Sequence, residues 1–128
     1  MVSNICRKTK ENILAWLPAI IWAGGIFYAS SLSLVLKPQA KILFADKIIH
    51  FFIYLPLGFF VARALWLSDK KVLRKNLIVL TVLICFLYGF SDEIHQLFVP
   101  CRQFSLWDAF SDILGSLAGI IIFKKIRT

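Results

Sequence analysis

Polar and ionisable residues recur at every fourth position in three stretches of this chain. Residues with this spacing lie on one face of a helix, one turn above another. The three sets are Asp46, His50 and Tyr54; Tyr88, Asp92 and Gln96; and Asp108 and Asp112. Three further charged residues, next to these sets or between them, are Lys47, Glu93 and Arg102. A histidine among carboxylates can act as an acid or a base, and lysine and arginine can hold a phosphate or carboxylate. All of these residues except Tyr88 therefore form the candidate site.

The rest of the chain is too apolar for a soluble domain. Of its 128 residues, 59% are hydrophobic and 17% charged, and the mean hydropathy is +0.78. Soluble domains carry about 25% charged residues. The net charge is +8, but the basic residues stand in short blocks between apolar segments, which argues against nucleic-acid binding. The length gives room for a single domain, residues 1–128.

Long apolar segments predict an all-α membrane protein, a bundle of four antiparallel transmembrane helices. The predicted helices cover about residues 12–32, 46–67, 76–98 and 105–123, separated by loops that include 33–45 and 68–75. Basic residues precede the first segment, as in a signal peptide. Its apolar core exceeds the roughly 7–15 residues of a signal sequence, so we expect an uncleaved helix, with cleavage near residues 29–31 as the alternative.

The lengths of the last two segments draw acidic residues into the membrane zone. The uncharged run from Ile113 to Phe123 has 11 residues, about 16 Å of helix, which cannot cross a hydrocarbon core of roughly 30 Å. The fourth helix therefore spans only if Asp112 and Asp108 enter that zone, and the third must take in Asp92 and its neighbour. Ionisable groups at this depth normally face a bundle interior or a wet cavity.

The basic residues divide unequally between the two sides of the predicted membrane. Eleven lie at the two termini or around the loop at 68–75, and four lie on the other side. The positive-inside rule therefore predicts that both termini are cytoplasmic and that the candidate site is at the outer side.

Neither the cysteines nor the spacing of possible ligands favours a disulfide or a zinc site. Cys6, Cys85 and Cys101 fall on the cytoplasmic side, in mid-membrane and in an outer loop, so we expect no disulfide. A divalent metal held by the acids and the histidine is an alternative, but Lys47 and Arg102 already offer countercharge. We therefore expect no metal and no other cofactor.

A purely structural role is the alternative for the polar residues. They could join helices by hydrogen bonds and ion pairs, each worth about 0.6–2 kcal/mol in membranes. We favour a functional site, because the number of polar residues exceeds what four helices need. For Ser111, Gly115 and Gly119, whose small side chains recur at every fourth position, we expect a close helix contact.

Three segments together resemble the VanZ-like family. They read DKIIHFFIY at 46–54, DEIHQLFVPCR at 92–102 and DAFSDILGSLAG at 108–119, against family patterns of approximately DKxxHFxxY, DExxQxFxxxR and DxxxNxxGxxxG. With IFYASS at 26–31, the resemblance covers about residues 16–123. Two positions depart from the pattern: Cys101 replaces a glycine, and Asp112 stands where asparagine is common.

The resemblance implies a small multi-pass protein of the bacterial cytoplasmic membrane. The named family member is an accessory in resistance to glycopeptide antibiotics of the teicoplanin type. We therefore expect this chain to contact membrane lipids and to bind or modify an envelope lipid, a lipid-linked wall precursor or such an antibiotic. A proton-coupled transporter or relay is an alternative, and a structural or assembly role is another. No oligomeric state follows from the sequence.

Binding is favoured over catalysis because no nucleophile stands out. Ser91 and Ser111 lie near the acids in sequence, but neither has the spacing of a nucleophile elbow or a triad, so no catalytic residue is assigned. Asp112 is the deepest acid of the predicted bundle. We expect it to pair with Lys47 or Arg102, or to be protonated and donate a hydrogen bond as an asparagine would.

Overall fold

The computed structural model describes residues 2–32, 43–68, 70–100 and 102–128, and within these ranges it is helical with no strand. The helices are α1 (Val2–Ser31), α2 (Leu43–Leu67), α3 (Lys71–Lys75), α4 (Leu77–Gln96) and α5 (Leu106–Arg127). The all-α prediction is confirmed. Cys101 and most of the predicted loop at 33–45 lie outside the described residues.

Two helices extend further than predicted, and a predicted loop is partly helical. Helix α1 begins at residue 2 instead of about residue 12. In these additional turns, an ion pair of 3.4 Å between Arg7 and Glu11 links one turn to the next. Helix α5 continues to Arg127, since basic residues in a last turn interact favourably with the helix dipole. The predicted loop at 68–75 contains the single turn of α3.

Four of the helices are long and apolar enough to cross a membrane: Asn4–Ser31, Ala45–Leu67, Leu77–Gln96 and Leu106–Arg127. Their burial pattern is the reverse of a soluble protein's. Large apolar side chains such as Ile21, Phe52 and Val79 are exposed, whereas Asp92, Glu93 and other polar residues are buried. The chain is therefore a multi-pass membrane protein.

Helices α2 and α5 form the most extensive contact in the structure. Glycines allow their backbones to approach: a methyl group on Gly115 would overlap the carbonyl oxygen of Phe51, and one on Gly119 would overlap that of Leu55. Gly58 of α2 packs in the same way against the backbone of Ser116. This close approach brings the polar faces of α2 and α5 together.

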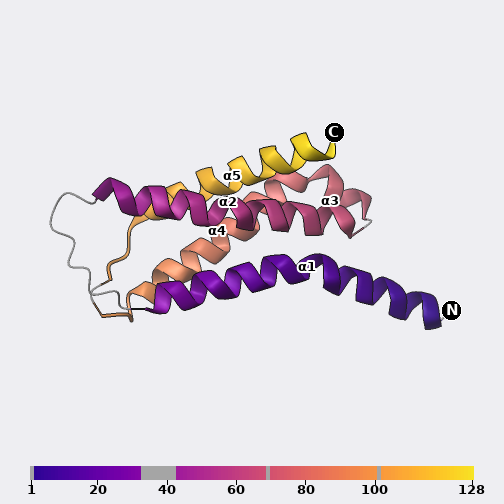
Figure 1. Cartoon of the computed structure of the whole chain (residues 1–128), viewed down its shortest axis with the longest axis horizontal. Helices are drawn as coiled ribbons and strands as arrows, with labels where there is room; N and C mark the ends of the chain where they lie inside the picture. Colours follow the sequence, from indigo (N-terminus) through magenta and orange to yellow (C-terminus); the bar gives the residue numbers. More distant parts are fainter. Residues whose placement is uncertain (1, 33–42, 69, 101) are drawn as a thin grey trace.

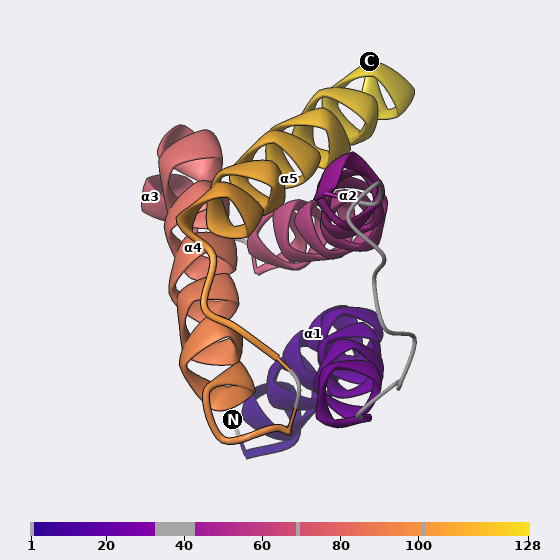
Figure 2. The same cartoon turned by 90° about the vertical axis from the view of Figure 1, so that its left-hand side faces the viewer.

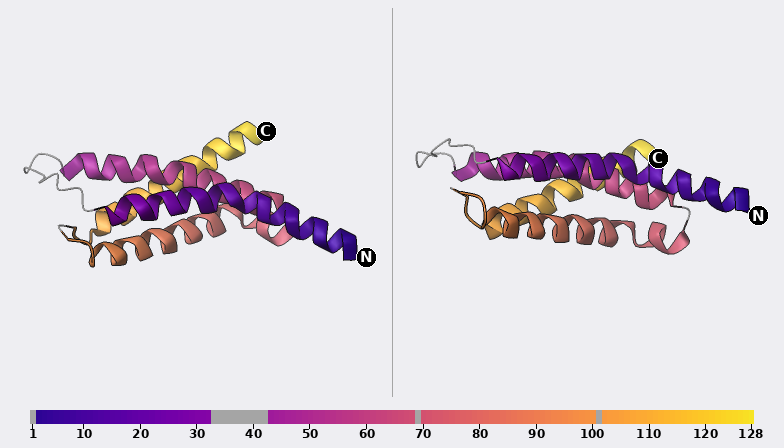
Figure 3. Two further views of the ribbon diagram at one scale, coloured as in Figure 1. Left: turned by 60° about the horizontal axis from the view of Figure 1, so that its bottom comes forward. Right: turned by 90° about the horizontal axis from the view of Figure 1, so that it is seen from below.

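Helix α1 packs along α2 and more sparsely against α4, and in the described part of the chain it does not contact α5. Figure 2 shows α1 and α5 on opposite sides of the bundle, with α2 and α4 between them. The first turns of α1 project beyond the other helices (Figure 3).

Side-chain donors cross the α1–α2 contact beside both prolines within these helices. Trp22 of α1 donates to the carbonyl of Ile53 at 2.8 Å, three residues before Pro56. Arg63 of α2 reaches the carbonyl of Ala15 at 3.5 Å, three residues before Pro18. A proline lacks the N–H that would bond the carbonyl four residues earlier, which here belongs to Leu14 or Phe52. The two contacts therefore add donors at the carbonyl next to the one that loses its own.

The two ends of the bundle differ in character. Both chain termini lie at one end, with α3, and the first turns of α2 and α5 lie at the other (Figure 1). The predicted site residues Asp46 and Asp108 stand in those first turns, and the basic last turn of α5 is at the terminal end.

Candidate functional site

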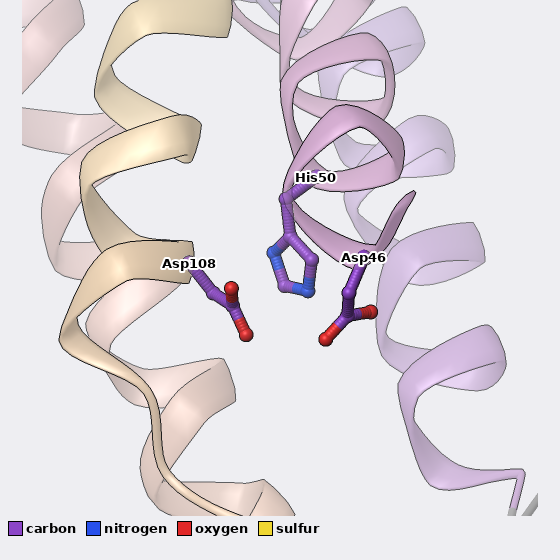
Figure 4. A group of neighbouring side chains, drawn as sticks. All are labelled: Asp46, His50 and Asp108. Atoms are coloured by element: carbon purple, nitrogen blue, oxygen red, sulfur yellow. The ribbon is translucent and has the colours of Figure 1, made fainter. Parts of the chain in front are cut away.

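Three side chains from α2 and α5 converge at the end of the bundle opposite the termini. One potential ligand atom from each of Asp46, His50 and Asp108 lies within 4.8 Å of the others. Figure 4 shows the three side chains pointing into the same space, two from α2 and one from α5. Asp108 is 4% exposed and His50 is 9% exposed, whereas Asp46 is half-buried. The group therefore reaches from the surface into the bundle.

Asp112 fixes the imidazole of His50 from the inner side. Its Oδ1 atom lies 2.9 Å from Nδ1 of His50, and the acid is 1% exposed. A carboxylate in this position holds the ring and selects the tautomer with a proton on Nδ1, which leaves Nε2 as the reactive nitrogen. The sequence predicts that Asp112 pairs with Lys47 or Arg102, or is protonated and donates a hydrogen bond; the partner in the structure is His50.

Lys47 supplies a positive charge at the rim. Its ammonium lies 3.6 Å from Oδ1 of Asp108, and its side chain is 29% exposed against 5% for the acid. The lysine is the more exposed partner of this pair, so its ammonium can also reach an anionic group at the rim. We call Asp46, Lys47, His50, Asp108 and Asp112 the α2–α5 cluster.

Tyr54 and Gly89 close the inner side of the cluster. The ring of Tyr54 stacks on that of His50, with the ring centroids 6.4 Å apart. The ring of Tyr88 follows at 6.3 Å from that of Tyr54. Gly89 of α4 faces this group: a methyl group there would lie 2.7 Å from Oδ2 of Asp112 and 3.3 Å from the hydroxyl of Tyr54. Neither of these two oxygens has a hydrogen-bond partner among the described residues.

Glu93 ties α4 to the segment that leads into α5. Its Oε2 atom accepts a hydrogen bond of 2.9 Å from the backbone N–H of Ser105, and its side chain is fully buried. Its other oxygen, Oε1, has no partner in the described part of the chain. Glu93 thereby positions the start of α5, which carries Asp108.

Two polar residues of α4, Tyr88 and Asp92, bond to α1, whereas the sequence groups Asp92 with the polar residues of α2 and α5 in one candidate site. Asp92 accepts a hydrogen bond of 2.6 Å from the hydroxyl of Ser30, and one of 3.4 Å from the amide of Gln96. One turn earlier, the hydroxyl of Tyr88 donates to the carbonyl of Ala23. Successive residues of a helix point in different directions, so Asp92 faces α1 while Glu93 faces the segment before α5.

Arg102 does not join the acids. Its side chain is half-buried, its backbone N–H donates to the carbonyl of Val99 at 3.2 Å, and it forms no ion pair within the described residues. Ser111, predicted to share a helix contact, donates to the carbonyl of Trp107 in its own helix at 3.0 Å.

Sequence reasoning missed three residues that complete this arrangement. Ser30 partners Asp92, Gly58 admits α5, and Gly89 admits the oxygens of Tyr54 and Asp112. The serine was visible in the ASS sequence at the end of the first helix, and the glycines are small residues within otherwise bulky spans.

Comparison with known protein families identifies the family of this chain. The VanZ/LLP1 family model matches residues 6–127, nearly the whole chain. The chain belongs to the VanZ/LLP1 family. The resemblance seen in the three sequence segments is thereby confirmed. No curated protein and no solved structure matched the chain.

The cluster of this VanZ/LLP1 protein has the donor set of a divalent cation site. Asp46, Asp108 and Nε2 of His50 would supply two oxygens and one nitrogen, and Asp112 would hold the ring from behind, as carboxylates commonly do for metal-binding histidines. The ammonium of Lys47, next to Asp108, would compete with the ion.

The two serines considered as nucleophiles are engaged elsewhere in this VanZ/LLP1 protein. The hydroxyl of Ser91 donates to the carbonyl of Tyr88 at 2.7 Å, and that of Ser111 is likewise bonded within its helix. The cluster can bind polar groups and can exchange a proton at His50.

Proposed function

We propose that this VanZ/LLP1 protein binds the polar headgroup of a lipid-linked envelope molecule in the α2–α5 cluster. The observation that carries the proposal is the convergence of Asp46, His50 and Asp108 at the start of two spanning helices, with Asp112 holding His50 from within. Buried ionisable groups in membrane spans are costly, and they are retained where they bind or transfer something.

The charge distribution supports a location at the outer face of the bacterial cytoplasmic membrane. Eleven basic residues stand on the side of the termini and four on the side of the cluster. By the positive-inside rule, the termini are cytoplasmic, and the cluster opens to the outer leaflet. Half-buried Asp46 and Lys47 form the rim from which a headgroup would enter.

The polar groups of the cluster favour a ligand that brings hydrogen-bond donors. Carboxylates accept hydrogen bonds, and Asp46 and Asp108 place two of them together beside His50. Sugar hydroxyls and amino groups are such donors, and Lys47 can bind an adjoining phosphate. A glycosylated lipid or lipid-linked wall precursor fits this description, and so does an acylated glycopeptide antibiotic, whose binding would make the protein a resistance accessory.

The experiment compares two probes with a neutral lipid. Purified protein in detergent is heated with a lipid-linked disaccharide wall precursor, with an acylated glycopeptide, or with phosphatidylcholine. At least one of the first two raises the unfolding temperature above that seen with phosphatidylcholine, and His50→Gln removes this increase. The matched control is His95→Gln, whose histidine contacts Ser31 of α1 at 3.0 Å, outside the cluster. No increase with either probe contradicts the proposal.

A divalent cation is a second candidate ligand, because the three potential ligand atoms lie within 4.8 Å of one another. Asp46, His50 and Asp108 would hold the ion, which would supply positive charge toward a headgroup phosphate. This candidate departs from the sequence expectation of no metal. Elemental analysis of the purified protein tests it. Stoichiometric zinc, manganese or iron in the wild type that is lost in Asp108→Asn supports the candidate. The same metal content in the wild type and in His50→Gln contradicts it.

A further inference from the structure

A basic pocket lies at the end of the bundle opposite the α2–α5 cluster. It has a volume of about 410 Å³ and is built from the end of α2, the end of α3, the start of α4 and the last turn of α5. We call it the basic pocket; its polar and aromatic lining residues are Trp66, Arg74, Lys75, Asn76, Lys124 and Arg127. It is separate from the α2–α5 cluster and independent of the proposed function.

Two guanidinium groups are held against the indole of Trp66. The guanidinium carbon of Arg127 lies 3.6 Å from the ring centroid and that of Arg74 lies 4.8 Å from it. Arg74 also donates from Nε to the carbonyl of Trp66 at 2.9 Å. These contacts order the two arginines before any ligand arrives, which lowers the entropic cost of binding.

The charges on the pocket wall are of one sign. Four of the lining residues are cationic, and none of the described residues that line the pocket is acidic. Like charges gathered in one concavity raise the local potential and attract anions. Phosphate suits this wall, because guanidinium groups bind it through paired hydrogen bonds.

The remaining wall is apolar and continues onto the outside of the bundle. It is formed by Leu77, Ile78 and Val79 at the start of α4, of which Ile78 and Val79 are 43% and 67% exposed. An acyl chain can lie along this face while the phosphate faces the arginines. Free phosphate would use only the basic half of the pocket.

We propose that the basic pocket binds the phosphate headgroup of an anionic phospholipid. Basic pockets between spanning helices, on the side rich in lysine and arginine, bind such headgroups in other membrane proteins. Trp66 lines the pocket near the end of α2 with its indole against two guanidinium groups, which matches the enrichment of tryptophan at membrane interfaces.

The test is a titration of the full chain in detergent with phosphatidylglycerol, with the bound lipid counted by native mass spectrometry. Arg127→Gln weakens phosphatidylglycerol binding about fivefold, the equivalent of about 1 kcal/mol for one basic residue. The matched control is Lys125→Gln, which removes the same charge from the same turn of α5 but does not line the pocket. It changes binding by less than about twofold, since a charge in solvent contributes little.

Three results would overturn the proposal. If Arg127→Gln and Lys125→Gln weakened phosphatidylglycerol binding equally, the lipid would be attracted by the overall surface charge and not by the pocket. Binding of phosphatidylcholine as tight as that of phosphatidylglycerol would remove the requirement for an anion. Complete displacement by millimolar inorganic phosphate would make free phosphate the ligand. Lys124→Gln, a second lining residue of α5, repeats the test if Arg127→Gln does not fold.

Discussion

The Nδ1 atom of His50 lies 2.9 Å from Oδ1 of Asp112, and this pair joins α2 to α5 inside the bundle. Asp112 occupies a position where asparagine is common in the family pattern. Asparagine also carries an Oδ1 atom, which can accept the same hydrogen bond from the imidazole. The contact therefore explains how either residue can hold the histidine.

Asp112→Asn should retain both stability and function, because it keeps the acceptor for His50. Asp112→Ala should lose part of both, since the buried imidazole loses its partner, at a cost of about 1–3 kcal/mol. Expression yield and unfolding temperature in detergent measure stability, and ligand-induced stabilisation measures function. If the asparagine variant fails as badly as the alanine variant, the negative charge itself is required, and a proton relay becomes the better account.

Gly115→Ala should destabilise the bundle by about 1–3 kcal/mol, because the added methyl group overlaps the carbonyl of Phe51 and pushes α5 away from α2. Gly24→Ala is the matched control: no atom lies within 4 Å of a methyl group at that position. It should be neutral or stabilise α1 by about 0.5–1 kcal/mol. Thermal unfolding in detergent separates the two, and an equal effect from both would argue against the close contact.

Ser30→Ala should loosen α1, because it removes the 2.6 Å hydrogen bond to buried Asp92. The expected loss is about 1–3 kcal/mol, the cost of a buried acceptor that loses a donor. Ser91→Ala is the control, since its hydroxyl is exposed and bonds to the carbonyl of Tyr88 in its own helix; it should change stability by less than about 0.5 kcal/mol. Limited proteolysis of α1 gives a local measurement, with faster cleavage expected for Ser30→Ala. Equal cleavage of both variants would argue against a stabilising hydrogen bond between Ser30 and Asp92.

The orientation can be measured with reporter fusions. A reporter active only outside the cytoplasm should be inactive after Thr128 or in the turn of α3, and active after Gln103, between α4 and α5. Activity at Thr128 would reverse the assignment and place the α2–α5 cluster on the cytoplasmic side.

Much of the fold follows from the sequence because its signals are local. Apolar length predicts the four spans, and the spacing of Asp108 and Asp112 predicts that both acids face inward. The lengths of α1 and α5 were underestimated, since charged residues outside the apolar core can still form helix.

The pairing of polar residues depends on how neighbouring helices are rotated and aligned, which no local pattern specifies. His50 meets Asp112 because Gly58 and Gly115 set the closeness of α2 and α5. Asp92 faces Ser30, because α1 covers that side of α4. Both contacts join residues far apart in the chain, so the spacing within one helix could not predict them.

The lipids that co-purify with the protein test the central claim most directly. Mild detergent extracts of bacteria expressing the wild type, His50→Gln or His95→Gln are compared by mass spectrometry of the bound lipids. The account predicts a glycosylated or lipid-linked species that is enriched with the wild type and with His95→Gln, and depleted with His50→Gln. Phosphatidylglycerol in the basic pocket should be equal in all three. An identical set of bound lipids in all three proteins would contradict a headgroup site in the α2–α5 cluster.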